Sequence, residues 1–329
     1  MQTINSSNSR DWRYSSNAAL FSSGRILCRF AILLSTLLLA CGEGKVAVGN
    51  ESYEPRIVIE GFLQPGPGVE RIRISRNFKV DANLQTLRLP LDDSEADVRI
   101  TDESSGKEYE LSYHPGENFR DSFFEYRGND LVIEHGKSYS LEVRATIEGK
   151  ELQARATTTV PEKGFEIVGV TPQSSPYRPL TEDGEPVNFE LTLERSPGTT
   201  MYVVSIRPDP ENIGSDYFIY DNPFTDETPQ DVDEDIHDFD YERDWIQNTP
   251  DGAGQSRADL FWFFFWFYGE YTVRIYAVDE NYMHFLQTFD DVQEDDGNFH
   301  EPLFDIEGDG IGVFGSVVAD SIKVEVLRN

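Results

Sequence analysis

Residues 138–160 read "SYSLEVRATIEGKELQARATTTV", and this stretch decides the fold class of the chain. Apolar and polar side chains alternate through residues 138–147 and again through 151–160, so each half has one apolar face. The intervening EGK at 148–150 is a turn signal. Because side chains alternate between the two faces of a sheet, the stretch predicts two neighbouring strands with one solvent-exposed face.

The same period of two recurs on both sides of this stretch, and turn signals such as "PGPG" and "SSGK" separate the repeats. Short strands with such spacing predict an all-β protein. We expect an immunoglobulin-like or transthyretin-like β-sandwich over residues 54–160 and a second β-sandwich domain with one helix over 165–329. The other alternating segments lie at 55–63, 69–76, 96–103, 187–194, 201–208 and 269–278, with a closing strand at 310–328.

The single expected helix lies in "DENYMHFLQTFDD", residues 279–291. Apolar side chains recur there at helical spacing, at Tyr282, Phe285, Leu286 and Phe289. Asp279 stands where an N-cap residue would accept the first free backbone amides.

The first forty residues resemble a secretory leader. The apolar run Phe30–Ala40 follows two arginines and is too short to span a bilayer, which takes about 20 apolar residues. The run ends in "LLAC", Leu38–Cys41, which resembles the lipobox of bacterial lipoproteins. We expect residues 1–40 to be removed, Cys41 to carry lipid, and the small, polar residues 41–53 to form a tether. The alternative is an ordinary signal peptide with an incidental cysteine.

The charge of the chain excludes one class of partner. There are 28 Lys and Arg against 60 Asp and Glu, a formal net charge of −32. Nucleic-acid binding needs a basic footprint, so we expect no nucleic-acid partner. An acidic surface is compatible with divalent cations, with basic partners, or with solubility alone.

An acidic segment at 209–258 interrupts the second domain. Asp231, Asp233 and Asp235 occupy positions one, three and five of a possible calcium loop, and Glu242 occupies position twelve. Position six holds Ile236 where an EF-hand needs glycine, so we do not expect an EF-hand. A looser calcium site and a solvated surface loop remain the two interpretations. The later "DIEGDG" at 305–310 is expected to be a turn.

The stretch "DLFWFFFWFYGEY", residues 259–271, contains eight consecutive aromatic residues. On a strand, four Phe side chains would share one face, and Trp262, Trp266 and Tyr268 would share the other with Phe264. Four bare aromatics would expose about 600 Å² or more, at or beyond the largest apolar patch usual on a monomer. We therefore expect a central strand buried on both faces. The alternatives are that the Trp/Tyr face binds a partner, stacks on sugars, or inserts into the membrane interface.

The sequence contains no G-x-S-x-G elbow, no H-E-x-x-H and no P-loop, and its five histidines have no metal-ligand spacing. We therefore assign no catalytic residue and expect a protein that is not an enzyme. Apart from the possible calcium, no cofactor is expected.

Several segments in this order resemble a family of Bacteroidota lipoproteins of unknown function, often encoded beside TonB-dependent outer-membrane receptors. They are "YEPRIVIEGFL" (53–63), "ADVRITDESSGKEYEL" (96–111), "GKSYSLEVRATIEGKELQARATTTVP" (136–161), "YTVRIYAVDENYMHFLQTFDD" (271–291) and "FHEPLFDIEGDGIGVFGSVVADSIKVEV" (299–326).

The resemblance implies a cell-envelope lipoprotein that acts as a non-catalytic accessory or binding subunit of a TonB-dependent uptake system. Gly42 follows the cysteine in place of the aspartate that commonly retains lipoproteins in the inner membrane, which favours the outer membrane. A surface glycan-binding or adhesion lipoprotein, stabilised by calcium, is the alternative function. An envelope hydrolase ranks third.

Overall fold

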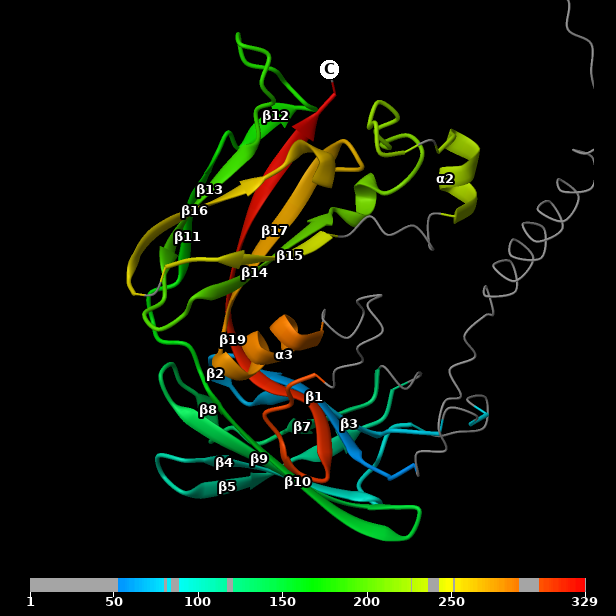
Figure 1. The fold of residues 1–329 in the computed structure, drawn as a ribbon, viewed down its shortest axis with the longest axis vertical. Helices are drawn as coiled ribbons and strands as arrows, with labels where there is room; N and C mark the ends of the chain where they lie inside the picture. The colour runs from blue at the N-terminus through cyan, green and yellow to red at the C-terminus, as the bar shows by residue number, and fades with distance from the viewer. Residues whose placement is uncertain are drawn as a thin grey trace, which may run out of the picture. The chain divides into compact units, whose positions relative to one another are not determined.

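The computed structural model describes most of the chain after the tether. The fold is mainly β, as the sequence predicts (Figure 1). The described residues are 53–79, 82–83, 89–116, 121–225, 227–235, 243–250, 252–289 and 302–328. The leader, the lipobox with Cys41 and most of the tether lie outside them.

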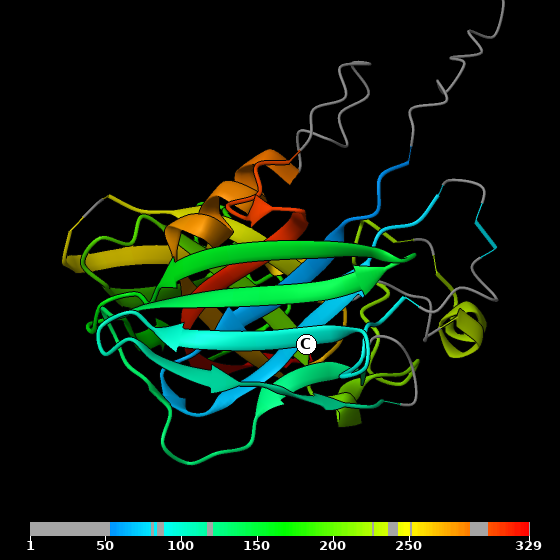
Figure 2. The same cartoon turned by 90° about the horizontal axis from the view of Figure 1, so that it is seen from below.

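A five-stranded sheet forms one layer of the first half, in the order β18-β10-β9-β4-β5 among the described strands. Its centre is the predicted hairpin of β9 (Ser138–Ile147) and β10 (Lys150–Thr159), which pair along their whole length. Figure 2 shows this sheet from below. The remaining strands are β4 (Ala96–Asp102), β5 (Lys107–Glu110) and β18 (Glu307–Gly308).

The facing layer belongs to a larger sheet that continues into the second half. Its described strands follow the order β15-β14-β17-β19-β1-β3-β7-β6, and β12 pairs with β19 off this path. In the first half these strands are β1 (Ile57–Leu63), β3 (Val69–Arg76), β6 (Ser112–His114) and β7 (Phe123–Tyr126). In the second half they are β12 (Ser174–Pro176), β14 (Met201–Pro208), β15 (Arg243–Asn248), β17 (Gly269–Val278) and β19 (Gly310–Leu327).

A three-stranded sheet, β11-β13-β16, covers the second half of the large sheet. Its strands are β11 (Glu166–Thr171), β13 (Phe189–Arg195) and β16 (Gly254–Leu260). Two short strands, β2 (Gly66–Pro67) and β8 (Val132–Ile133), pair with each other beside the first half.

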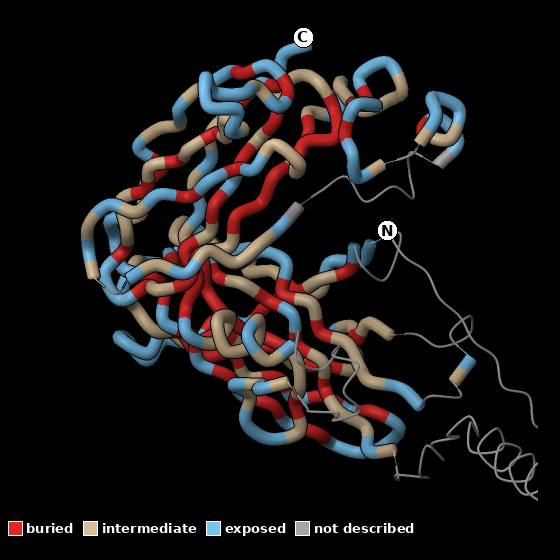
Figure 3. The backbone as a smooth tube through the Cα atoms, turned by 45° about the horizontal axis from the view of Figure 1, so that its top comes forward, coloured by how far each residue is buried: buried red, intermediate tan, exposed pale blue. Residues whose placement is uncertain are grey.

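Two hydrophobic clusters fill the spaces between the layers. Figure 3 colours the buried residues of both halves red along the backbone. In the first, fully buried Ile59 and Ile72 of the large sheet meet Leu141 and Val143 of the five-stranded sheet. In the second, the apolar faces of β13 and β16 meet those of β14, β17 and β19. Each cluster joins the inner faces of two sheets, which is the sandwich-type packing that the alternating pattern predicts.

Strand β19 links both halves of the large sheet. Its first residues pair in parallel with β1, and the following ten pair antiparallel with β17. The approach to β1 is so close that a Cβ on Gly312, where φ is +107°, would lie 2.1 Å from the carbonyl oxygen of Ile59. Only glycine fits this position without strain. The domain boundaries at 54–160 and 165–329 stay a prediction, because both halves share this strand.

The described residues contain two α-helices, α2 (Pro229–Asp235) and α3 (Glu280–Phe289), and two 3-10 helices, η2 (Pro210–Asn212) and η3 (Trp262–Phe264). Helix α3 is the one that the sequence predicts at 279–291. It packs on β19 at the junction of the two halves.

Candidate functional site

The eight aromatic residues 261–268 do not form the central strand that the sequence predicts. Strand β16 ends at Leu260, the chain turns through η3, and β17 begins only at Gly269. Because β16 belongs to the three-stranded sheet and β17 to the large sheet, this stretch carries the chain from one layer of the second sandwich to the other.

The second half of the aromatic stretch is buried in the core. Phe265, Trp266 and Phe267 are consecutive and all buried, so the predicted alternation of a Phe face with a Trp/Tyr face is wrong. The backbone amides of Trp266 and Phe267 donate hydrogen bonds of 3.1 and 2.7 Å to the hydroxyl oxygen of Tyr271. That hydroxyl donates to the carbonyl of Phe267 at 3.0 Å, and burial raises the pKa of Tyr271.

The first half of the stretch reaches the surface. Phe224 is 66 % exposed and stacks on Trp262, with 6.0 Å between ring centroids. The buried Tyr177 makes T-shaped contacts with Trp262 and Tyr268, with 5.9 and 6.5 Å between ring centroids. We call the exposed and half-exposed set the aromatic–arginine surface. It comprises Arg178, Tyr217, Phe224, Phe261, Trp262, Phe263, Tyr268 and Arg328.

Two exposed arginines lie over rings of this surface. The guanidinium carbon of Arg178 is 4.7 Å from the ring centroid of Trp262. The guanidinium carbon of Arg328 is 5.5 Å from the ring centroid of Tyr217 and 5.6 Å from the ring centroid of Tyr268. Within the described residues, neither guanidinium pairs with a carboxylate; Arg328 donates to the backbone carbonyl of Asp216. Cation–π contacts of this kind hold the charge in place while leaving its hydrogen-bond donors available.

Two buried polar groups beside this surface have no hydrogen-bond partner among the described residues. They are the hydroxyl of Tyr177 and the side-chain nitrogen of Asn222, whose residues are 5 % and 1 % exposed. Burial raises the pKa of Tyr177, so its hydroxyl keeps its proton. A buried donor without an acceptor costs about 1–3 kcal/mol. The next residue, Arg178, has a left-handed backbone with φ of +50°.

This arrangement is suited to binding another protein more than to stacking on sugars. Trp, Tyr and Arg are the residue types that dominate binding energy at protein interfaces. Of the three residues predicted for a ligand face, the structure brings Trp262 and Tyr268 to the surface and buries Trp266 in the core. Arg178 lies over Trp262 and Arg328 lies near Tyr268, so neither ring offers a bare face on both sides.

Two of the acidic residues proposed for calcium lie in a helix and not in a loop. Asp231 and Asp233 lie in α2, where side chains two residues apart project in different directions. Asp231 accepts hydrogen bonds from the backbone amide and hydroxyl of Thr228 at the start of this helix. The side chain of Asp235 and all of Glu242 lie outside the described residues. Across the described part of the chain, no group of three or more His, Cys, Asp or Glu has metal-binding geometry.

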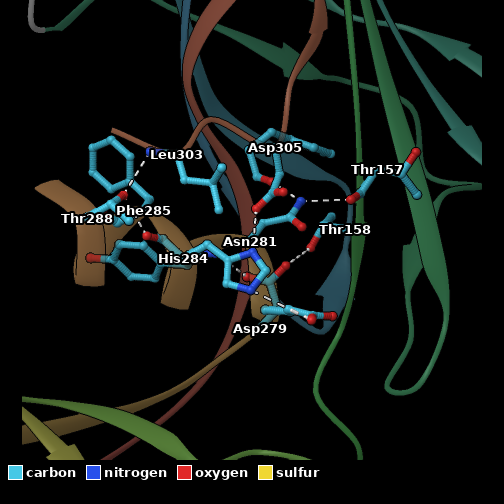
Figure 4. Close-up of polar contacts among 12 residues, drawn as sticks. Thr157, Thr158, Asp279, Asn281, His284, Phe285, Thr288, Leu303 and Asp305 are labelled. Atoms are coloured by element: carbon cyan, nitrogen blue, oxygen red, sulfur yellow. Dashed lines mark hydrogen bonds and ion pairs between the residues drawn. The ribbon is translucent and has the colours of Figure 1, made fainter. Parts of the chain in front are cut away.

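A second polar cluster, which the sequence indicated only as a helix cap, lies where α3 meets both sandwiches (Figure 4). Asp279 accepts the backbone amide of Tyr282 at 3.1 Å, which confirms the predicted N-cap. Its other carboxyl oxygen lies 2.5 Å from the hydroxyl of Thr158 in β10. That hydroxyl lies 2.8 Å from the hydroxyl of Ser316, which donates to the carbonyl of Thr159 at 3.0 Å. Burial raises the pKa of Asp279.

Open pockets flank this cluster on two sides. One of about 390 Å³ is lined by Glu162, Thr199, Asp279, Glu280 and Met283 among others. Another of about 600 Å³ lies against Thr157, Asn281 and Asp305. Beside it the ring of His284 is 2.9 Å from a carboxyl oxygen of Asp305. Among the described residues the imidazole of His284 has carboxylate partners, Asp305 and Glu280, and no hydrogen bond to a hydroxyl or thiol side chain, so we assign no catalytic role here. The segment 305–310, which the sequence predicts to be a turn, contains the short strand β18, and Asp309 lies in the bend between β18 and β19.

None of the described helices is both long and apolar enough to cross a membrane. A search of curated proteins found no match. One family model matches the chain from residue 45 to residue 322, and therefore covers both sandwiches, α3 and most of β19. The chain belongs to this family, which is described as a domain of unknown function, DUF4249.

Proposed function

We propose that this protein is a lipid-anchored, non-catalytic accessory subunit of the outer membrane, and that it binds a TonB-dependent receptor through the aromatic–arginine surface. The anchor is the lipid expected on Cys41, at the end of the apolar run Phe30–Ala40. More than one acyl chain is needed for stable anchoring, as is usual for mature lipoproteins of bacteria.

The observation that carries the proposal is the composition of the aromatic–arginine surface. Phe224 is 66 % exposed and Phe261 and Tyr217 are each 39 % exposed, and they lie on one linked set of ring contacts with two arginines. Aromatic residues and Arg are enriched at protein interfaces, whereas Lys, Glu and Asp are depleted there. In a chain of net charge −32, a surface of this composition is suited to a partner protein.

A single purification tests the proposal. The full chain, tagged at the C-terminus, is expressed in its own cells, outer membranes are dissolved in mild detergent, and co-purifying proteins are quantified by mass spectrometry. A TonB-dependent receptor in near-equal amount is the expected result. Recovery of the tagged protein without a receptor would contradict the proposed function.

The anchor is tested in the same cells with Cys41→Ser. We expect this variant to lose metabolic labelling with a fatty acid and to leave the outer-membrane fraction. Retained labelling, or retention of residues before Cys41 in the wild-type protein, would rule out lipidation at this cysteine.

A further inference from the structure

We infer that the aromatic–arginine surface binds an acidic segment of its partner, whose carboxylates pair with Arg178 and Arg328 while its apolar side chains pack on Phe224 and Trp262. The inference rests on the proposed function, because it names the chemistry of the partner at the same surface. It commits to a segment of a protein, in preference to a glycan or a lipid.

The charges supply the first argument. Arg178 and Arg328 are exposed, and neither pairs with a carboxylate in the described part of the chain. Other exposed arginines of this chain are paired, such as Arg155 with Glu103 at 3.2 Å and Arg257 with Glu190 at 3.1 Å. In a protein with 60 acidic and 28 basic side chains, two arginines left without carboxylates beside one aromatic cluster favour an acidic occupant.

The geometry of the guanidinium groups supplies the second argument. Both lie over aromatic rings, 4.7 Å from Trp262 for Arg178 and 5.6 Å from Tyr268 for Arg328. A ring holds the planar group at a fixed orientation, so less rotamer freedom is lost when a carboxylate binds it. A guanidinium offers five donors in a fork that matches a carboxylate with two hydrogen bonds.

Local acidic side chains limit how the occupant approaches. Asp221 lies close enough to raise the pKa of Tyr268, after the larger effect of burial, so an acidic segment must reach Arg328 beside a carboxylate of this chain.

Site-specific photo-cross-linking tests the inference in cells that make the full-length lipoprotein. A benzophenone amino acid replaces Phe224 in one strain, and Val132, which is 50 % exposed in the first sandwich, in a matched control. Cross-linked peptides are mapped by mass spectrometry. We expect the Phe224 position to reach a receptor segment that carries Asp or Glu within about five residues, a reach of about 17 Å. We expect Val132 not to reach that segment.

Charge reversal in the same strain measures the contribution of the arginines. Arg178→Glu with Arg328→Glu should lower the cross-link yield about tenfold or more, since interface arginines are frequent hot spots. Arg178→Lys with Arg328→Lys should give an intermediate loss, because Lys keeps the charge without the planar fork. Unchanged thermal unfolding of each variant shows that the fold is intact.

The outcomes separate this inference from the function on which it rests. The inference is overturned if the receptor co-purifies but the Phe224 position is cross-linked to a neutral or basic segment of it. The inference is also overturned if only the Val132 position is cross-linked to the receptor. Both outcomes leave the proposed function standing. An unchanged yield after charge reversal also overturns it. Absence of any receptor from the purification removes the proposed function itself.

Discussion

Thr158 and Asp279 join the two halves of the protein through side-chain oxygens that lie 2.5 Å apart. Thr158 is the penultimate residue of the hairpin strand β10, and Asp279 caps helix α3 immediately after β17. Ser316 of the shared strand β19 completes the contact, 2.8 Å from the same threonine hydroxyl. The junction of the two sandwiches therefore depends on three short polar side chains from three strands or strand ends.

Burial and hydrogen bonding act in opposite directions on Asp279. Burial raises the pKa of its carboxyl, while the hydrogen bonds that it accepts from Thr158 and from backbone amides lower it. Burial is the larger effect, so the pKa is raised in the folded protein.

Asp279→Asn should therefore remove a pH dependence while keeping the contacts of α3. The raised folded-state pKa means that this carboxyl stabilises the fold fully below its unfolded value of 3.8, and that this contribution is lost as the pH rises through the folded value. The loss is about 1.4 kcal/mol for each unit of pKa difference. Thermal unfolding of both proteins at pH 4 and pH 7 should show that the stability of the variant, relative to that of the wild type, is greater at pH 7 than at pH 4.

The exposed residue Glu151 provides the control for this experiment. Glu151→Gln makes the same change of charge at the surface, and its effect at the two pH values is the reference for Asp279→Asn. An Asp279→Asn difference that is the same at pH 4 and pH 7 would show that Asp279 is ionised in the folded protein.

Tyr271→Phe should destabilise the second sandwich strongly. Its hydroxyl oxygen accepts two backbone amides, from Trp266 and Phe267, in a fully buried site. Each amide left without an acceptor costs about 1–3 kcal/mol. Tyr202→Phe is the matched control, because that buried hydroxyl accepts one amide, from Ser196 at 2.9 Å. Urea unfolding should show about half the loss for the control, and equal losses would contradict the role given to the Tyr271 hydroxyl.

A fragment that ends after the predicted first domain should fail to fold. Residues 53–162 contain β1 and the hairpin β9–β10 but lack β18 and β19, which pair with β10 and β1. Phe314 of β19 is also part of the first hydrophobic cluster. We expect the fragment to give no cooperative thermal transition, and a chain of residues 53–329 to give one. A cooperative transition from the fragment would show that 54–160 is an independent domain.

The regular strands and the single long helix could be predicted from the sequence because each has a clear period. The alternation of apolar and polar residues in 138–160 predicted the hairpin β9–β10. The helical spacing of apolar residues after Asp279 predicted α3. Residues 261–268 are apolar at every position, so no period distinguishes a buried strand from a turn that crosses between layers. The hydroxyl of Tyr271 accepts two backbone amides that a neighbouring strand would otherwise bind. No local sequence pattern indicates this role.

The aromatic–arginine surface could not be predicted because its parts are far apart in the sequence. Arg178, Phe224, Trp262 and Arg328 come from four separate segments that meet only when both layers of the second sandwich are in place. The sequence pointed to Trp262 and Tyr268 for their residue type alone. Neither arginine stands out in a chain with 28 basic side chains.

The most direct test of the proposed account compares receptor recovery with the wild-type protein and with Arg178→Glu/Arg328→Glu. The control is Lys150→Glu/Lys163→Glu, which changes the net charge equally at two exposed positions outside this surface. All three proteins are purified from outer membranes, and the receptor is quantified relative to the tagged chain. We predict about a tenfold or greater loss of receptor for the arginine variant and little change for the lysine variant. Equal receptor recovery with all three would contradict the claim that this surface binds the receptor.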